Sequence, residues 1–253
     1  MRKPTTSAKP QAKAAKPAKP RRPGRPSAAG NVDLRERVLD AAIALFAERG
    51  IAATPLRAIA SATGVTPALL HYYFKTRDSL VETLLAERVA PFVARSAAPL
   101  LKPLPSPRAT LRLFLETHMR NLAANPWMPR LMAREVLSEG GSLREHMQAH
   151  FSAVLSPKML GLIAAAQRKG EIRADLNPLL TGLSLISLAV FPFAAMPLWR
   201  AVAAAYLRDT AFEAYAERAR EAQERAIGTE VLIEHTLALF DSALEPEHAK
   251  SKR

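Results

Sequence analysis

The chain has 253 residues, a formal net charge of +13 and no cysteine, and 49% of its residues are hydrophobic. The absence of cysteine excludes disulfide scaffolds, cysteine-ligated zinc, iron–sulfur clusters and thiol nucleophiles. The apolar content excludes a wholly disordered chain. The positive charge favours nucleic acid or an anionic membrane surface as a partner, without indicating a fold.

The first 30 residues carry nine of the positive charges and no acidic residue, which leaves +4 for the rest of the chain. They are otherwise mostly Ala, Pro, Ser, Thr and Gly, so we expect a disordered basic arm over residues 1–30. Its lack of an apolar run excludes a secretory signal. Arg22 and Arg25 stand in an Arg-Pro-Gly-Arg-Pro run that resembles an AT-hook, which inserts arginines into a narrow minor groove. The alternative is a solvated tail that raises non-specific DNA affinity only.

An amphipathic helix is predicted after the arm. Asp33 is a suitable N-cap, and Gly50 stands where a C-terminal glycine is expected. Between them, apolar residues recur with the spacing of one helix face: Leu34, Val38, Ala41, Ala42, Leu45 and Phe46.

Two short helices follow, each with a Thr-Pro start. Thr54 and Pro55 begin the first, and Thr66 and Pro67 the second, in which Leu70, Tyr73 and Phe74 are expected to face inward. Ala60, Gly64 and Leu70 have the spacing of the small residue, turn glycine and central apolar residue of a helix-turn-helix. The alternative is a three-helix packing unit with no role in DNA binding.

The run from 35 to 80 resembles the N-terminal domain of TetR/AcrR-type transcriptional regulators. The matching residues are 38–42, 45–46, Gly50, 59–60, 64–66, 70–74, Arg77 and Leu80. His71 departs from the tyrosine usual in the family, and Arg77 from a frequent lysine. The resemblance implies that residues 67–74 form a recognition helix, which enters the major groove by its N-terminal end.

The DNA contacts follow from that placement. Arg57, on the preceding helix, is the candidate for a guanine contact, with a phosphate as its alternative partner. Residues expected to face bases or sugar–phosphate are Thr66, Pro67, Ala68, Leu69 and Tyr72, and those placed for phosphates are Thr54, His71, Tyr73, Lys75 and Arg77.

No strand alternation appears after Leu80, so the chain is predicted to be all-α. We expect a three-helix helix-turn-helix domain at 31–80, a helical ligand-binding and dimerisation domain at 81–246 and a disordered tail at 247–253. The first expected helices are residues 79–101, kinked at Pro91, then 107–124, and then a short helix from Asn125-Pro126 to about Gly140. A capping box of Ser142 and Glu145 is expected to begin the next helix, which runs to residue 169 and is kinked near Pro157. The remaining expected helices are one that starts at Asn177-Pro178, one at 211–225 and one at 229–244.

Residues 177–199 contain no charge over 23 positions, about the length of a membrane span. Pro192 and Pro197 argue against a span, and a break at Pro192 leaves a helix of buried-core length. We instead expect a helix that packs on its own domain and on a second subunit.

In the resembled family the last two bundle helices form a four-helix dimer interface. Here these are residues 178–190 and 229–244, with Leu183, Ile186, Val190, Leu232, Thr236 and Leu239 as candidate contacts. The family also binds a small molecule inside the bundle. Candidate pocket residues are Phe114, His118, Trp127, Met128, Met132, Phe151, Phe191, Phe193 and Trp199, with plain core packing as the alternative.

Enzyme and metal functions have little support. His146 and His150 have metal-ligand spacing on a helix, but two histidines on a polar face are usually solvated. No phosphate loop or nucleophile elbow is present. The sequence therefore predicts a cytoplasmic, homodimeric regulator without cofactor or enzyme activity, most simply a ligand-responsive repressor of a palindromic DNA operator. The rival hypotheses are a nucleoid-associated architectural protein and a membrane-attached helical protein.

Overall fold

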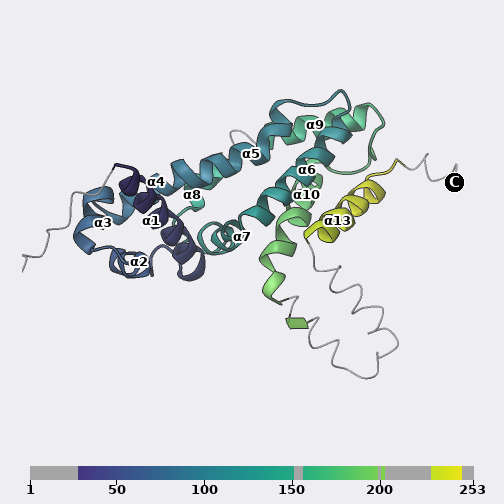
Figure 1. Ribbon diagram of the computed structural model, residues 1–253. Coiled ribbons are helices and arrows are strands. Elements are labelled where there is room, and N and C mark those ends of the chain that lie inside the picture. The colour runs from purple at the N-terminus through teal and green to yellow at the C-terminus, as the bar shows by residue number, and fades with distance from the viewer. Residues whose placement is uncertain (1–27, 151–155, 199–200, 203–228, 247–253) are drawn as a thin grey trace, which may run out of the picture.

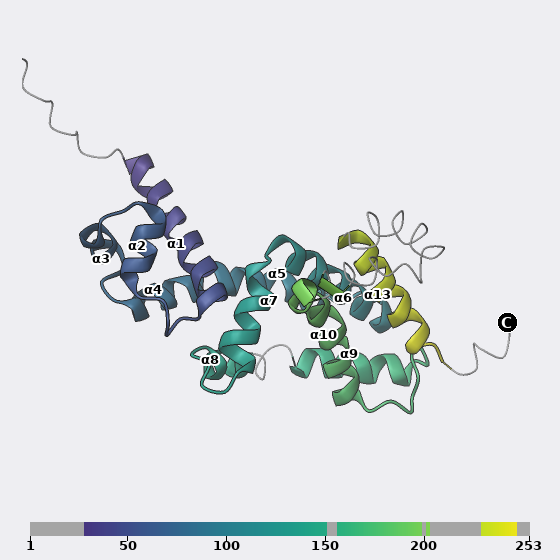
Figure 2. The same ribbon diagram turned by 90° about the horizontal axis from the view of Figure 1, so that it is seen from below.

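The computed structural model describes residues 28–150, 156–198, 201–202 and 229–246. Within those ranges every regular element is helical, as the sequence predicted (Figure 1). A compact N-terminal domain lies at one end of an elongated molecule, and a helical body lies at the other (Figures 1 and 2). Arg22, Arg25, Phe151, Trp199, the helix expected at 211–225 and the expected tail at 247–253 lie outside the described residues.

The N-terminal domain consists of α1 (Ala28–Arg49), α2 (Leu56–Thr63), α3 (Pro67–Phe74) and α4 (Arg77–Leu84). The prediction that Asp33 caps the first helix is wrong, because α1 begins at Ala28 and Asp33 lies inside it. Alanine is the best helix former, so Ala28 and Ala29 extend the helix beyond its amphipathic part. The helix ends as expected at Gly50, whose φ is +92° and whose N–H donates to the Phe46 carbonyl.

The core of this domain contains the residues that the helical periodicity selects. Ile59, Leu70 and Leu80 are almost fully buried, and they come from three different helices. Leu39 and Phe46 of α1 belong to the same core. Burial of each such side chain contributes about 1.5–3 kcal/mol to folding. The short helices α2 and α3 are therefore stabilised by tertiary packing rather than by their own length.

One helical run connects the domain to the body. α4 continues through a π-helical turn, η1 (Leu85–Val89), into α5 (Ala90–Leu101). Just before Pro91, where the sequence predicts a kink, the helix contains this π-turn, in which the Ala90 N–H donates to the Leu85 carbonyl. Pro91 has no N–H, so widening of the preceding turn relieves the ring's clash with the earlier carbonyl. The run begins at Arg77, where the Thr76 hydroxyl caps it by accepting from the Ser79 N–H at 3.1 Å.

The body is built around α6 (Pro107–Ala124), which packs against α5, α9, α10 and α13. Its N-cap is Ser106, whose hydroxyl accepts from the Ala109 N–H at 3.1 Å. The other elements are α7 (Trp127–Met132), the π-turn η2 (Ala133–Leu137), α8 (Arg144–His150), α9 (Ser156–Arg168), α10 (Pro178–Ala194) and α13 (Thr229–Ala243).

Two expectations about these helices have opposite outcomes. Asn177 caps α10 as expected, since its side-chain oxygen accepts from the Leu179 N–H at 2.9 Å. The capping box expected from Ser142 is wrong, because α8 begins at Arg144 and the Ser142 N–H instead donates to the Glu135 carboxylate at 3.0 Å.

The uncharged segment forms α10, a helix of 17 residues that packs on the body. Thr181, Gly182, Leu185 and Ala189 are buried on its inner side. None of the helices in the described ranges combines the length and the apolar character that crossing a bilayer requires.

Candidate nucleic-acid interface and apolar cavity

The turn between α2 and α3 has the backbone that the sequence predicted. Gly64 lies in the left-handed region at φ +69°, where a residue with a Cβ is strained. The Val65 N–H donates to the Ala60 carbonyl at 3.1 Å, which closes the end of α2. Thr66 then caps α3, its hydroxyl accepting from the Leu69 N–H at 3.3 Å. These contacts fix the orientation of α3 relative to α2.

α3 divides cleanly into a buried and an exposed face. Leu70 and Phe74 lie in the core, whereas Tyr72 is 77% exposed. Pro67, Ala68 and His71 are also exposed, and Leu69 is half-buried. A short helix with an uncovered N-terminal end and small apolar side chains on that end can approach base edges and thymine methyl groups closely.

Cationic side chains flank this face. Arg57 on α2 is exposed and makes no hydrogen bond or ion pair with the described residues. Lys75 is exposed just after α3, at a positive φ of 55°. Arg77 donates to the Ala52 carbonyl at 3.4 Å and lies 3.9 Å from the Asp78 carboxylate. Arg57 and Lys75 are therefore available to phosphates or bases, while Arg77 is partly engaged.

Two of the expected phosphate contacts are wrong. Thr54 is fully buried and its hydroxyl donates to the Gly50 carbonyl at 2.7 Å, so it braces the end of α1. Pro55, rather than Thr54, occupies the N-cap position of α2. Tyr73 is half-buried, and its hydroxyl lies inside the domain without a partner among the described residues. Neither side chain is placed to reach DNA.

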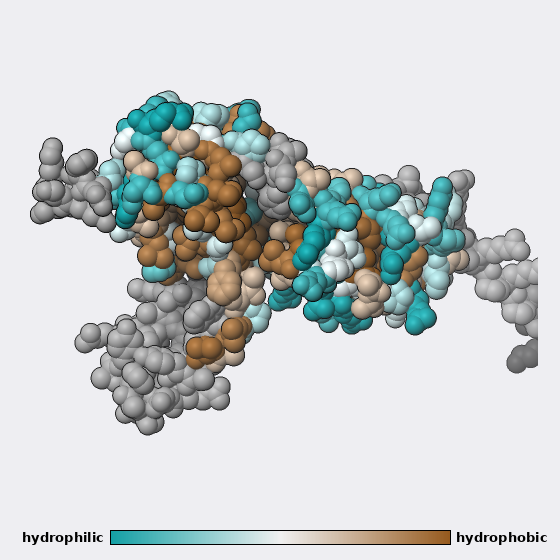
Figure 3. Space-filling view, turned by 180° about the vertical axis from the view of Figure 1, so that it is seen from behind, coloured by the Kyte–Doolittle hydropathy of each residue, from teal (hydrophilic) through white to brown (hydrophobic). Residues whose placement is uncertain are grey.

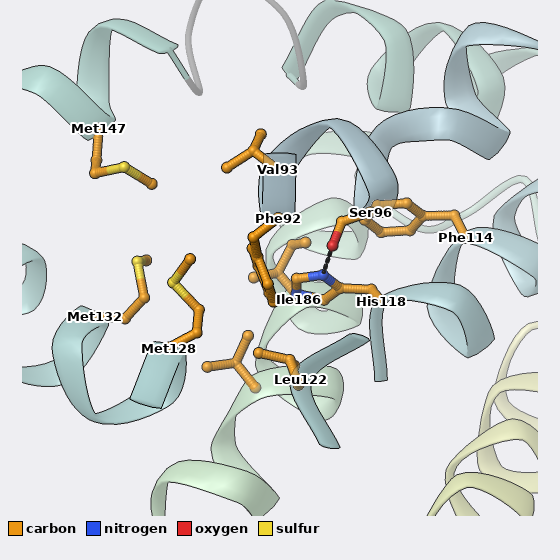
Figure 4. Close-up of a pocket in the computed structure, with 11 residues that line it drawn as sticks. Phe92, Val93, Ser96, Phe114, His118, Leu122, Met128, Met132, Met147 and Ile186 are labelled. Carbon is orange, nitrogen blue, oxygen red and sulfur yellow. Dashed lines mark hydrogen bonds between the residues drawn. The ribbon is translucent and has the colours of Figure 1, made fainter. Parts of the chain in front are cut away.

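An apolar cavity lies in the body between α5, α6, α7, α8 and α10. Its space is about 520 Å³, including the part that opens toward solvent. The lining residues are Phe92, Val93, Ser96, Phe114, His118, Leu122, Met128, Met132, Met147, Ile186 and Val190 (Figure 4).

Four of the expected pocket residues line this cavity, namely Phe114, His118, Met128 and Met132. Trp127 lies behind them, with its ring centroid 6.0 Å from that of Phe92. The expectation for Phe191 is wrong, because its side chain is 61% exposed on α10. Phe193 packs against the core outside the cavity lining.

Ile186 and Val190, which the sequence analysis assigned to a dimer interface, line the cavity from α10. Sequence reasoning missed the α5 wall, where Phe92, Val93 and Ser96 have helical spacing directly after Pro91. That spacing was a usable signal, but on a buried helix it is identical to the spacing of ordinary core residues.

The cavity has one polar cluster. The Ser96 hydroxyl lies 2.9 Å from His118 Nδ1 and accepts a hydrogen bond from the Asn121 amide at 2.8 Å. The His118 ring stacks on Phe114 at a centroid distance of 5.7 Å. Burial lowers the pKa of His118 to about 4, so its imidazole is neutral at physiological pH.

Comparison with known proteins adds the family. Residues 38–84 match the family model for bacterial regulatory proteins of the tetR family, and residues 107–223 match the model for the tetracyclin repressor-like C-terminal domain. The chain belongs to the TetR family. It is therefore a helix-turn-helix transcriptional regulator and not an enzyme, as the sequence predicted.

Individual relatives are distant. The HTH-type transcriptional repressor KstR2 of Rhodococcus jostii is 26% identical over 148 residues, which are 58% of this chain and 72% of the relative. The TetR-family regulator PfmR of Thermus thermophilus has a TM-score of 0.58 at 18% identity, covering 84% of this chain and 96% of PfmR. FadR of Bacillus subtilis in complex with stearoyl-CoA has a TM-score of 0.57 at 18% identity, covering 83% of this chain and all of FadR. Identities this low in the solved structures establish the shared fold alone.

In this TetR-family chain, ion pairs join the DNA-binding domain to the start of the body. Arg35 of α1 donates two hydrogen bonds of 2.6 Å to the Glu87 carboxylate of η1. These bonds lower the pKa of Glu87. Arg88 reaches back to Glu36 at 2.8 Å and Asp40 at 2.9 Å. The π-turn that accommodates Pro91 is thus also the segment held against α1.

A second contact between the DNA-binding domain and the body lies at the C-terminal end of α1. Glu135 of η2 is buried, and one of its carboxylate oxygens accepts from the Ile51 N–H at 2.9 Å. Arg134 donates to the Arg49 carbonyl at 3.3 Å. Because η2 directly continues α7, the helix that carries Met128 and Met132 also holds the C-terminal end of α1.

Proposed function

We propose that this chain is a repressor that binds a palindromic DNA operator as a homodimer and releases it when an apolar effector enters the cavity. The observation that carries the proposal is the continuity of α7 and η2. Met128 and Met132 line the cavity, and Glu135, on the next turn, holds the Ile51 N–H at the end of α1. A shift of the cavity wall is thereby coupled to the domain that carries α3.

Operator recognition rests on the exposed face of α3 and on Arg57. The apolar end of α3 suits contact with thymine methyl groups, and Arg57 suits a guanine edge or a phosphate. His71, Lys75 and Arg77 are assigned to the backbone of the DNA, where they fix the position of the protein without reading sequence. One such helix reads too few base pairs, so two copies on a palindrome are required.

An apolar effector is supported by the cavity lining, in which Ser96 and His118 are the polar side chains. It is also consistent with relatives. The FadR structure contains stearoyl-CoA, and a curated relative from Bacillus subtilis, 23% identical over 141 residues, is called fatty acid metabolism regulator protein. We therefore assign the effector to long apolar molecules such as acyl compounds.

The proposed dimer interface is the outer side of α10 and α13, which lie side by side in the body (Figure 2). Leu183 and Phe191 are 63% and 61% exposed on α10, and Leu239 is 45% exposed on α13. Figure 3 shows a broad apolar area on the C-terminal body beside the more hydrophilic DNA-binding domain. Exposed apolar surface of this kind is typical of protein interfaces.

The other expected interface residues contribute less. Leu232 is half-buried against the core of its own chain. Thr236 is 3% exposed in the single chain and lies in that core, so the expectation that it contacts a second subunit is wrong.

In this proposal, repression and release correspond to a population shift between two spacings of the DNA-binding domains in the dimer. The effector favours the spacing that no longer matches half-sites one helical turn apart. The regulator acts on chromosomal DNA in the cytoplasm.

Selection from a random DNA library, at fixed salt, tests the DNA-binding half of the proposal. We expect enrichment of a palindrome bound at least a thousandfold more tightly than random DNA. Equal affinity for selected and random DNA would contradict the proposal and would indicate an architectural DNA-binding protein.

A further inference from the structure

The hydrogen bonds around the cavity determine which atom of His118 carries its proton. The chain of contacts begins at Asn121, which is buried between α5 and α6. Its side-chain oxygen accepts from Arg95 Nε at 3.3 Å and from the Asn125 amide at 3.1 Å. Both neighbours are donors in this geometry, so the oxygen of Asn121 must face them and its NH₂ group must face the other way.

The NH₂ group of Asn121 then donates to the Phe92 carbonyl and to the Ser96 hydroxyl, both at 2.8 Å. Ser96 is buried, and its hydroxyl has a single proton to donate. Within the described residues, the acceptor available to that proton is His118 Nδ1 at 2.9 Å. The Ser96 hydroxyl therefore accepts from Asn121 and donates to His118.

An imidazole that accepts at Nδ1 carries its proton on Nε2 when neutral. Figure 4 shows the ring projecting among the cavity side chains with Nδ1 turned toward Ser96. Nε2 lies on the other side of the ring and has no partner among the described residues. The cavity thus presents one fixed N–H donor in an otherwise apolar lining.

We propose that the effector carries an uncharged carbonyl oxygen, of a ketone, ester or thioester, that accepts a hydrogen bond from His118 Nε2–H. This inference rests on the proposed function, in that it takes the cavity as the effector site. A carboxylate fits poorly, because no lysine or arginine lines the cavity and a buried charge with one neutral donor remains uncompensated. A hydroxyl group can accept from Nε2–H, but its own proton finds no strong acceptor in this lining.

Affinity measurements with two probes of the same shape test the inference. 2-Nonanone carries the carbonyl, and 2-methyl-1-nonene replaces its oxygen with a CH₂ group. Binding to the full-length protein is followed by tryptophan fluorescence, since Trp127 contacts Phe92 of the cavity wall. The measured quantity is the ratio of the two affinities in the wild type and in two variants, His118→Phe and His118→Gln.

We expect the ratio of ketone to alkene affinity to fall about fivefold or more in His118→Phe, the typical worth of one buried hydrogen bond. It should stay near the wild-type value in His118→Gln, whose amide restores an N–H donor. Nonanoate at pH 7.5 should bind more weakly than 2-nonanone. An unchanged ratio in His118→Phe, or tighter binding of nonanoate, overturns the inference while leaving the cavity as an effector site.

A measurement on the wild type does not depend on the folding of any variant. Long-range ¹H–¹⁵N NMR of the His118 ring distinguishes the two neutral tautomers directly. Protonated Nε2 is the expected result, and protonated Nδ1 overturns the inference. Failure of the wild type to bind either 2-nonanone or the alkene contradicts the proposed effector site itself, and this inference with it.

Discussion

Glu135 and Ile51 meet where the body touches the DNA-binding domain, and the buried carboxylate of Glu135 accepts the Ile51 N–H at 2.9 Å. The second oxygen of the same carboxylate accepts the Ser142 N–H at 3.0 Å. A Cβ placed on Gly50 would lie 3.1 Å from this carboxylate, so the chain turns closely around it. One side chain thus contacts both the chain just after α1 and the connection between η2 and α8.

Replacing this side chain tests whether it couples the domains. Glu135→Ala leaves two backbone N–H groups without their acceptor, which we expect to lower the free energy of unfolding by about 1–3 kcal/mol for the buried Ile51 N–H alone. We also expect operator release by a cavity ligand to weaken. Urea denaturation and DNA-binding titrations measure the two effects. Glu116→Ala, on α6, serves as the control; a wild-type ligand response in Glu135→Ala would argue against coupling through this residue.

The DNA-binding face is tested by Arg57→Ala and Tyr72→Ala. Both side chains are exposed on the domain surface, so we expect the melting temperature to change little. Affinity for the selected operator should fall about tenfold for each, since a good base contact contributes about 1–3 kcal/mol. Gel-shift titration measures the effect. Arg130→Ala removes an exposed charge from the body and is the matched control; operator affinity unchanged in Arg57→Ala and Tyr72→Ala rules out this face.

The proposed dimer interface is tested by Leu239→Glu. A carboxylate at this site would be buried between subunits, and we expect the dimer dissociation constant to rise by a factor of about ten or more. Sedimentation equilibrium gives the constant. Leu104→Glu is a matched control, because Leu104 is 44% exposed and Leu239 is 45% exposed. Equal effects of the two substitutions, or none, would place the interface elsewhere.

The stability of the folded protein should depend on pH because His118 is buried in its neutral form. Its pKa is about 4 in the folded protein and about 6.5 in the unfolded chain. Below pH 6.5 the unfolded state binds a proton that the folded state does not, so stability falls as the pH drops from about 6.5 to 4. His118→Phe lacks this term. The difference in unfolding free energy between wild type and variant should therefore change by about 2–3 kcal/mol across this window; a difference independent of pH would mean that His118 is not buried as described.

Removal of residues 1–30 tests the role of the basic arm. We expect affinity for all DNA sequences to fall alike and the dependence of log K on log salt to flatten, because fewer counterions are released. Binding at several salt concentrations gives this slope. Selective loss of preference for A·T-rich flanks would instead show that Arg22 and Arg25 enter the minor groove.

Sequence alone predicted the DNA-binding domain well because its signals are local. Gly64 must adopt a positive φ, Thr66 must cap α3, and Ile59 and Leu70 must face the core; each requirement depends on neighbours within a turn or two. The prediction that Thr54 contacts a phosphate was wrong because its burial depends on how the chain folds at the end of α1. The position of Thr54 after Ala52 and Ala53 does not reveal that fold.

The cavity was harder to predict because its walls come from separate helices. Met128 and Met132 could be recognised as adaptable side chains, but the α10 wall could not. Ile186 and Val190 face inward while Leu183 faces outward on the same helix, and the helix has large apolar residues on both of these sides. In such a helix periodicity no longer separates the face toward the core from the face toward a partner. The contact of Glu135 with Ile51 joins residues 84 positions apart and left no local signal.

The most direct test of the account is the affinity of the dimer for its selected palindrome with and without saturating 2-nonanone, measured by fluorescence anisotropy at fixed salt. We predict that the ketone weakens binding at least fivefold and that affinity for random DNA changes less. If 2-nonanone occupies the cavity while affinity for the palindrome stays constant, the cavity does not control DNA binding and the central claim is wrong.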